Sequence, residues 1–112
     1  TPTNQNQALL KRISAIGGGE IPTNDLLIWA DLYPLIDRLY NHFHARLMTR
    51  YSDRLTDKEV QICCLLCADF STKEIGVVTQ QTSATIYVRK TSIRKKIGAA
   101  EGEDIVAHVN AV

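Results

Sequence analysis

Residues 55–98 read LTDKEVQICCLLCADFSTKEIGVVTQQTSATIYVRKTSIRKKIG, and this stretch contains the clearest structural signals of the chain. In two places a hydroxyl residue precedes a glutamate by three positions, at Thr56–Glu59 and at Ser71–Glu74. This spacing is typical of a capping box, in which the two side chains satisfy backbone N–H groups at the start of a helix. Apolar residues at helical spacing follow both sites. The pattern therefore predicts helices over residues 57–68 and 72–79.

A third helix is predicted over residues 83–97, and its two faces differ. Thr82 or Ser83 can cap its start, and Gly98 is a natural stop. One face carries Ile86, Ile93 and Ile97, and the opposite face carries Ala84, Tyr87, Val88, Thr91 and Arg94. The helices at 72–79 and 83–97 are joined by a tight turn, and the second of them has two different faces. This is the helix-turn-helix arrangement that presents a helix to a DNA groove.

The positive charge of the chain is concentrated in the same region. The 112-residue chain has a net charge of +1, whereas residues 71–98 hold six basic residues and one acid, a net charge of +5. The rest of the chain therefore sums to −4. This distribution is expected of a protein that binds a polyanion.

No nucleophile–base pair, glycine-rich phosphate loop or acid pair is apparent, so no catalytic residue and no enzymatic activity are predicted.

The segment resembles the DNA-binding domain of the LuxR/FixJ (GerE-type) transcription regulators and aligns with it without a gap. The matching residues are Leu55-Thr56, Glu59, Ile62, Leu66, Phe70-Ser71, Lys73-Glu74-Ile75, Thr85-Ile86, Ile93, Lys96 and Ile97-Gly98. The resemblance extends to about Val109 and implies an all-α, helix-turn-helix four-helix bundle, with its third helix in the DNA major groove and its fourth helix at 102–110. It implies a sequence-specific transcription regulator, of which this chain is the DNA-binding output module.

The sequence departs from the family pattern at several positions. Asp69 replaces the glycine that usually turns the chain between the first two helices, although aspartate tolerates the left-handed backbone conformation. Thr79 and Gln81 occupy positions that are normally aliphatic, so their polar groups need partners. Tyr87 replaces a frequent lysine and Arg89 a frequent histidine. The usual base contacts of the family therefore cannot be copied residue by residue.

We expect base-edge contacts from the centre of the outward face of the third helix, at Tyr87, Val88 and Thr91. The methyl groups of valine and threonine suit contact with thymine. Phosphate contacts are expected from Lys73, Thr85, Arg89, Arg94, Lys95 and Lys96. The resemblance also implies that two copies pair through the fourth helix, which offers Ile105, Val106 and Val109. The expected partners are double-stranded DNA and a second copy, with RNA polymerase as a further candidate.

Two other functions compete with this interpretation. Sigma-factor region four carries a similar pattern and binds promoter DNA as part of a polymerase, but other sigma segments are absent and the KKIG ending favours the regulator. The second alternative is a helix-turn-helix protein-interaction module without DNA binding, which Gln81 and Tyr87 motivate.

Residues 1–54 are predicted to form a helical extension or linker before the DNA-binding domain at 55–112. Residues 5–16 have helical apolar spacing and end at a flexible triple glycine, Gly17–Gly19. A longer helix is predicted over 25–51, and Pro34 must kink or interrupt it. This helix carries Trp29, Tyr33, Phe43, Leu47 and Tyr51, and it is similar to the aromatic-rich helix that leads into the domain in some regulators. It either covers its own core or pairs with its copy in a dimer.

The three cysteines, Cys63, Cys64 and Cys67, lie on one predicted helix. They can pack in the core as small apolar groups or act in metal or redox sensing. No second ligand pair at zinc spacing is visible, so no metal and no cofactor are predicted. The odd number of cysteines and the lack of a secretion signal predict a cytoplasmic location. No apolar run could span a bilayer. The Thr-Pro start, with Met48 as the single methionine, suggests a longer protein in which an anchor would lie upstream.

Overall fold

The computed structural model of the protein describes residues 29–111, with their side chains from Leu32 onward. Its helices are α2 (Trp29–Leu39), α3 (Phe43–Tyr51), α4 (Asp57–Cys67), α5 (Thr72–Thr79), α6 (Ser83–Ile97) and α7 (Ile105–Ala111). Within this range there is no strand, which confirms the predicted all-helical fold. None of these helices has the length and apolar character needed to cross a membrane. The helix expected over 5–16 and the glycines at 17–19 lie outside the described residues.

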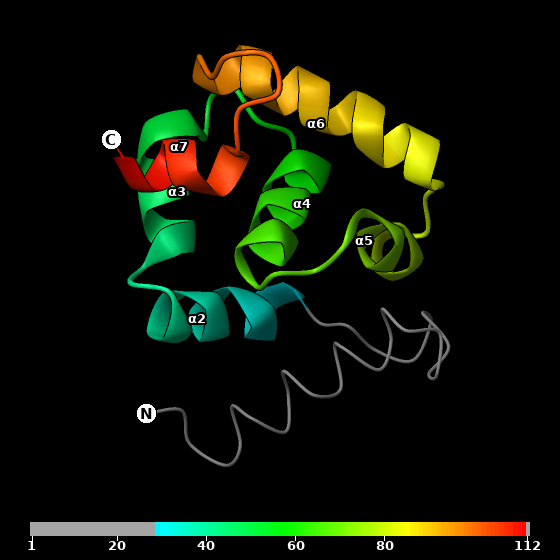
Figure 1. The fold of residues 1–112 in the computed structure, drawn as a ribbon. Helices are drawn as coiled ribbons and strands as arrows, with labels where there is room; N and C mark the ends of the chain where they lie inside the picture. The colour runs from blue at the N-terminus through cyan, green and yellow to red at the C-terminus, as the bar shows by residue number, and fades with distance from the viewer. Residues whose placement is uncertain (1–28, 112) are drawn as a thin grey trace.

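Helix α4 is the centre of the arrangement, since each of the other five helices packs against it. Figure 1 shows α6 along one side of the molecule and α2 on the opposite side, with α4 between them. Helix α5 packs closely against the first part of α6, and α7 packs against α4 and α6.

The predicted starts of α4, α5 and α6 are confirmed. The Thr56 hydroxyl accepts a hydrogen bond from the Glu59 N–H, and the Glu59 carboxylate accepts one from the Thr56 N–H. Ser71 and Glu74 form the same reciprocal pair at the start of α5. The side chain of Thr82 caps α6. These bonds satisfy N–H groups that a helix start would otherwise leave unpaired.

The turn between α4 and α5 relies on a left-handed residue, as expected. Asp69 adopts a φ of 67°, which a non-glycine residue rarely does but aspartate tolerates. At the far end of α6, Gly98 adopts a φ of 79°, and the N–H of Ala99 donates to the Arg94 carbonyl to close the helix.

The single helix predicted over 25–51 is wrong within the described residues, because two helices occupy this region. Pro34 lies inside α2 and does not end it. The break comes at Asn41 and His42, whose φ values of 55° and 59° are left-handed and incompatible with a continuing helix. The Asp37 side chain accepts a hydrogen bond from the Ala45 N–H across this turn, which fixes the start of α3.

Helix α7 begins at Ile105, three residues later than the predicted 102. Gly102 adopts a φ of 76°, which ends any helical path through the preceding turn. The Asp104 carboxylate then accepts a hydrogen bond from the Ala107 N–H and caps α7.

One hydrophobic core joins the two sides of the predicted boundary at residue 54. Leu32, Ile36, Phe43 and Leu47 are fully buried and belong to the same cluster as Ile62 and the other core residues of α4 to α7. The described part of the extension therefore covers the core of its own chain. A large share of its apolar surface is thus unavailable to a second copy.

The cysteines are unpaired thiols that belong to this core or pack against it. Cys63 and Cys64 are buried, and Cys67 is half-buried. Burial raises the pKa of Cys63 to about 12 and that of Cys67 to about 11, and it raises the pKa of Cys64 strongly. Within the described residues there is no group of three or more histidine, cysteine and acidic side chains that could hold a metal.

Candidate nucleic-acid interface

Helix α6 separates a buried face from an exposed one, as its sequence predicts. Ile86, Ile93 and Ile97 are buried, whereas Tyr87 is 61% exposed and Val88 is 70% exposed. Of the large hydrophobic side chains that the structure describes, these two are the exposed ones. Because these two apolar side chains are adjacent and face the solvent on one helix, they mark a candidate contact surface.

Polar and basic side chains continue this surface along α6. Thr91 and Lys95 are exposed and follow Tyr87 at steps of one helical turn. The Thr91 hydroxyl donates a hydrogen bond to the Tyr87 carbonyl over 3.2 Å. The apolar part that Thr91 adds to this surface is its methyl group. The Lys90 ammonium lies 5.8 Å from the centre of the Tyr87 ring, within the range of a cation–π contact. We call the side chains of Tyr87, Val88, Thr91 and Lys95 the outer stripe of α6.

The turn between α5 and α6 is very tight, and Gly76 permits it. The Gln81 N–H donates to the Gly76 carbonyl over 2.8 Å. A Cβ atom at position 76 would lie 2.6 Å from the Gln81 carbonyl oxygen, so a larger residue cannot be placed without displacement of the backbone. Gln80 closes α5 with a left-handed φ of 59°. The importance of Gly76 could not be predicted from the sequence pattern. It depends on how closely the turn at Gln81 approaches the helix, and the pattern does not show that distance.

The polar side chains of Thr79 and Gln81 form a hydrogen bond with each other. The buried hydroxyl of Thr79 donates to the Ile75 carbonyl and accepts a hydrogen bond from the Gln81 amide. The Gln81 side-chain oxygen in turn accepts a hydrogen bond from Nε of Arg89. This chain of bonds links α5, the turn and α6 through side chains rather than through apolar packing. Arg89, expected at the phosphates, is half-buried and has Nε committed to the turn.

Glu59 has a second role that its capping motif did not reveal. Its carboxylate is 3% exposed and accepts from the Lys96 ammonium over 2.7 Å and from the Ser92 hydroxyl over 3.2 Å. Burial, the largest influence, acts to raise the pKa of Glu59, but the hydrogen bonds from Lys96, Thr56 and Ser92 and the Lys96 charge outweigh it and lower the pKa. One buried carboxylate therefore joins the start of α4 to the second half of α6. Lys96, another expected phosphate contact, is directed toward this carboxylate.

The remaining residues expected at phosphates differ in their accessibility. Lys73, near the start of α5, and Lys95 on α6 are exposed, and neither makes an ion pair among the described residues. Thr85 is half-buried and accepts a hydrogen bond from the Thr82 hydroxyl. Arg94 is half-buried, and its Nε donates to the Glu103 carbonyl over 2.7 Å.

The residues expected at a dimer contact lie mostly inside the chain. Ile105 is 3% exposed and Val109 is 2% exposed, because α7 packs them against α4 and α6. Val106 is half-buried. The apolar stripe of α7 therefore serves the core of its own chain, and a contact between copies through α7 would need its outer residues, such as Ala107 and Asn110, which are exposed.

The chain matches no protein-family model, and it matches neither a curated protein nor a solved structure. The candidate interface therefore rests on the chemistry and geometry of its own residues: a tightly turned helix pair whose second helix exposes an apolar, hydroxyl and basic stripe.

Proposed function

We propose that this chain is a sequence-specific DNA-binding transcription regulator of the helix-turn-helix type, similar to the LuxR/FixJ output domains. Helix α5 and the turn at 80–82 support α6, which enters the major groove as the recognition helix. The observation that carries the proposal is the exposure of Tyr87 and Val88 on the outer stripe, next to the exposed Lys95.

The chemistry of the outer stripe suits base edges. The major groove presents the thymine methyl group beside hydrogen-bond donors and acceptors that differ for each base pair. Val88 and the methyl group of Thr91 supply apolar contacts, and the Tyr87 hydroxyl supplies a hydrogen bond. The Lys90 ammonium, 5.8 Å from the centre of the Tyr87 ring, adds a weak cation–π contact to this surface.

The phosphate contacts flank this stripe. Lys73 on α5 and Lys95 on α6 supply exposed ammonium groups from two different helices. Arg94 and Thr85 supply further donors from α6. Arg89 and Lys96 act mainly within the protein, where they hold the turn and the second half of α6 in place. Because phosphate contacts carry no sequence information, they set affinity and orientation while the outer stripe sets specificity.

The direct test is selection of bound duplexes from a random-sequence pool, followed by a mobility shift with the enriched sequence. We expect a shared motif to emerge and the shift to weaken with added salt. The variant with both Tyr87→Ala and Thr91→Ala should lose the preference for that motif. Arg38→Ala is the matched control, since Arg38 is exposed on α2, on the side of the molecule opposite α6. Recovery of no motif and no retarded complex would reject the proposal.

A protein-interaction module is the second candidate function, and the same exposed pair favours it. Tyr87 and Val88 would then form the centre of a protein contact, with Lys90 and Lys95 at its polar rim. This function predicts that the duplex selection fails, whereas the Tyr87→Ala variant still loses binding to a protein partner. Pairing of two copies on a two-fold operator belongs to the first proposal, and sedimentation of the protein on one and on two half-sites tests it.

A further inference from the structure

A hollow of about 610 Å³ lies between the end of α4, the second half of α6 and the start of α7. Its apolar part is formed by Leu66, Phe70, Ile105 and Val106, which are buried or half-buried. None of the side chains of the outer stripe borders this hollow. Its volume is in the range of sites for small molecules, about 300–1,000 Å³. The hollow is therefore separate from the surface proposed to read DNA bases.

Charged side chains of both signs border the same hollow. Lys90 and Arg94, about one helical turn apart, supply two cations from α6. Asp69 and Asp104 supply two carboxylates from the segments after α4 and before α7. None of these four groups is in an ion pair within the part of the chain that the structure describes. An apolar hollow bordered by separate positive and negative groups complements a ligand that carries both charges and an apolar part.

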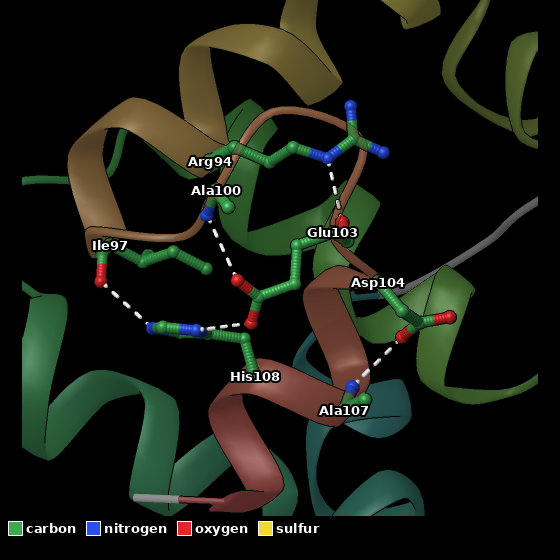
Figure 2. Close-up of polar contacts among 7 residues, drawn as sticks. All are labelled: Arg94, Ile97, Ala100, Glu103, Asp104, Ala107 and His108. Carbon is green, nitrogen blue, oxygen red and sulfur yellow. Dashed lines mark hydrogen bonds and ion pairs between the residues drawn. The ribbon is translucent and has the colours of Figure 1, made fainter.

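Figure 2 shows the Arg94 guanidinium and the Asp104 carboxylate extending to the same side of the loop before α7. Nε of Arg94 donates to the Glu103 carbonyl over 2.7 Å, and the two terminal amino groups point away from Glu103. One oxygen of Asp104 accepts a hydrogen bond from the Ala107 N–H over 2.8 Å, and the other points away from α7. The Glu103 side chain turns the other way, toward His108. Arg94 and Asp104 are each held by one contact and keep polar atoms for a ligand.

We propose that this hollow binds an amino acid with an apolar side chain. Arg94 and Lys90 bind the ligand carboxylate, whose shape a guanidinium matches. Asp104 binds the ligand ammonium group, and the apolar side chain lies on Leu66 and Val106. Because the four charges that border the hollow sum to zero, a simple anion or cation is attracted by one pair and repelled by the other.

A second copy of the chain is a less suitable occupant of the hollow. The exposed α7 residues at its edge, Ala107 and Asn110, are small or polar and offer a partner little apolar surface. Two of the apolar side chains of the hollow are recessed, since Phe70 is 8% exposed and Ile105 is 3% exposed. A flat contact between copies would leave these side chains without a partner, whereas a small molecule can reach them.

Three probes that share a phenyl group separate the effects of the two ligand charges: phenylalanine, phenylpropionate, which lacks the ammonium group, and phenethylamine, which lacks the carboxylate. Each is titrated into the isotopically labelled protein at neutral pH, and the amide NMR shifts of Phe70, Val106 and Ala107 report binding. Phenylalanine should bind with a Kd on the order of 1 mM, as expected for a ligand of its size. The two singly charged probes should bind roughly fivefold more weakly.

Three outcomes of these titrations would overturn the proposal. The first is the lack of a saturable shift with phenylalanine, and the second is an affinity for phenylalanine no higher than that for either singly charged probe. The third is the appearance of the same shifts when the protein concentration alone is raised, which would identify a second copy as the occupant.

Two double variants assign the charges, with circular dichroism to show that each is folded. Lys90→Gln with Arg94→Gln removes the cations, so phenylalanine and phenethylamine should bind it equally. Asp69→Asn with Asp104→Asn removes the carboxylates, so phenylalanine and phenylpropionate should bind it equally. Asparagine tolerates the left-handed backbone at position 69 and can still cap α7. Arg38→Gln, exposed on α2 on the opposite side from α6, is the control and should keep the wild-type order of affinities. An equal loss for all three probes in the double variants would overturn the assignment.

Occupancy of the hollow should also weaken DNA binding, and this consequence rests on the proposed function. The terminal amino groups of Arg94 cannot bind a ligand carboxylate and a phosphate together. Saturating phenylalanine, which carries no net charge, should therefore lower the affinity for the selected duplex roughly fivefold, as for one lost phosphate contact. The Lys90→Gln, Arg94→Gln variant should show no such effect. Binding of phenylalanine without any duplex binding rejects the proposed function and leaves the ligand site standing. Duplex binding without phenylalanine binding rejects the ligand site alone.

Discussion

The Glu59 carboxylate and the Lys96 ammonium lie 2.7 Å apart although 37 residues separate them in the chain. Glu59 is buried at the start of α4, and Lys96 is in the last turn of α6 with 35% of its side chain exposed. The same carboxylate caps α4 and accepts the Ser92 hydroxyl. The Glu59 carboxylate therefore links the start of α4 to the second half of α6, the proposed recognition helix.

Replacement of Glu59 by Gln should lower the free energy of unfolding by about 2 kcal/mol, because the buried carboxylate loses its charge and with it the ion pair to Lys96, although glutamine can still accept the hydrogen bond from the Thr56 N–H. Lys96→Met should also destabilise the fold, since it leaves the buried carboxylate without its cation. The double variant should be more stable than the sum of the two losses predicts. Urea unfolding followed by circular dichroism measures all three, with Glu101→Gln as an exposed control. Additive losses would show that the two side chains do not interact.

The same pair predicts the response of stability to acid. The pKa of Glu59 is lowered from its ordinary value of 4.5 in the folded protein. Its carboxylate therefore contributes stability that is fully present above that value and is lost as the pH falls through the lowered pKa. The difference in unfolding free energy between wild type and Glu59→Gln should shrink as the pH is taken below 4.5. A difference that stays constant down to the acid transition would contradict the assignment.

Gly76→Ala should destabilise the α5–α6 pair by about 2 kcal/mol, because the new Cβ would lie 2.6 Å from the Gln81 carbonyl oxygen and the turn must move. Gly98→Ala is the comparison. Its φ of 79° strains alanine, but no atom lies within 4 Å of the new Cβ, so the cost should be near 1 kcal/mol. Thermal unfolding of both variants measures the difference. An equal or smaller loss in Gly76→Ala would mean that the turn is not tightly packed.

Local sequence signals predicted the starts of α4 and α5, but not the break between α2 and α3 or the role of α7. The capping boxes at Thr56 and Ser71 act within four residues, so the starts of α4 and α5 could be predicted from the sequence. The break between α2 and α3 could not, because Asn41 and His42 adopt left-handed conformations without a glycine to mark them. The stripe of Ile105 and Val109 was visible, but periodicity cannot tell a helix that covers its own core from one that pairs with a second copy.

The candidate interface was also predictable only in part. The outward face of α6 was predictable from its angular spacing, and Tyr87 and Val88 are exposed as expected. The internal partners of Arg89 and Lys96 were not, since they depend on Gln81 across the turn and on Glu59 from another helix. The charge of the segment alone therefore overestimated how many of its basic side chains lack a partner within the protein.

The cysteines should react slowly with iodoacetamide in the folded protein at neutral pH, because the thiolate is the reactive form and burial raises the pKa of all three. Cys67 is half-buried and has a pKa of about 11, so it should be modified before Cys63 and Cys64. Mass spectrometry of timed samples gives the order, and the protein unfolded in urea gives the unprotected rate. Rapid modification of Cys63 at neutral pH would argue for a reactive rather than a packing role.

Two classes of variant on α6 should affect DNA binding differently. Lys95→Ala should weaken binding to every duplex and reduce the slope of log affinity against log salt by about one, because one phosphate contact is removed. Tyr87→Ala and Thr91→Ala should instead reduce the preference for the selected motif by roughly 1–3 kcal/mol per lost base contact. Mobility shifts with the motif and with a scrambled duplex, each over a range of salt concentrations, separate the two effects. If Tyr87→Ala and Thr91→Ala leave both affinity and preference unchanged while binding persists, the recognition surface is not the outer stripe of α6.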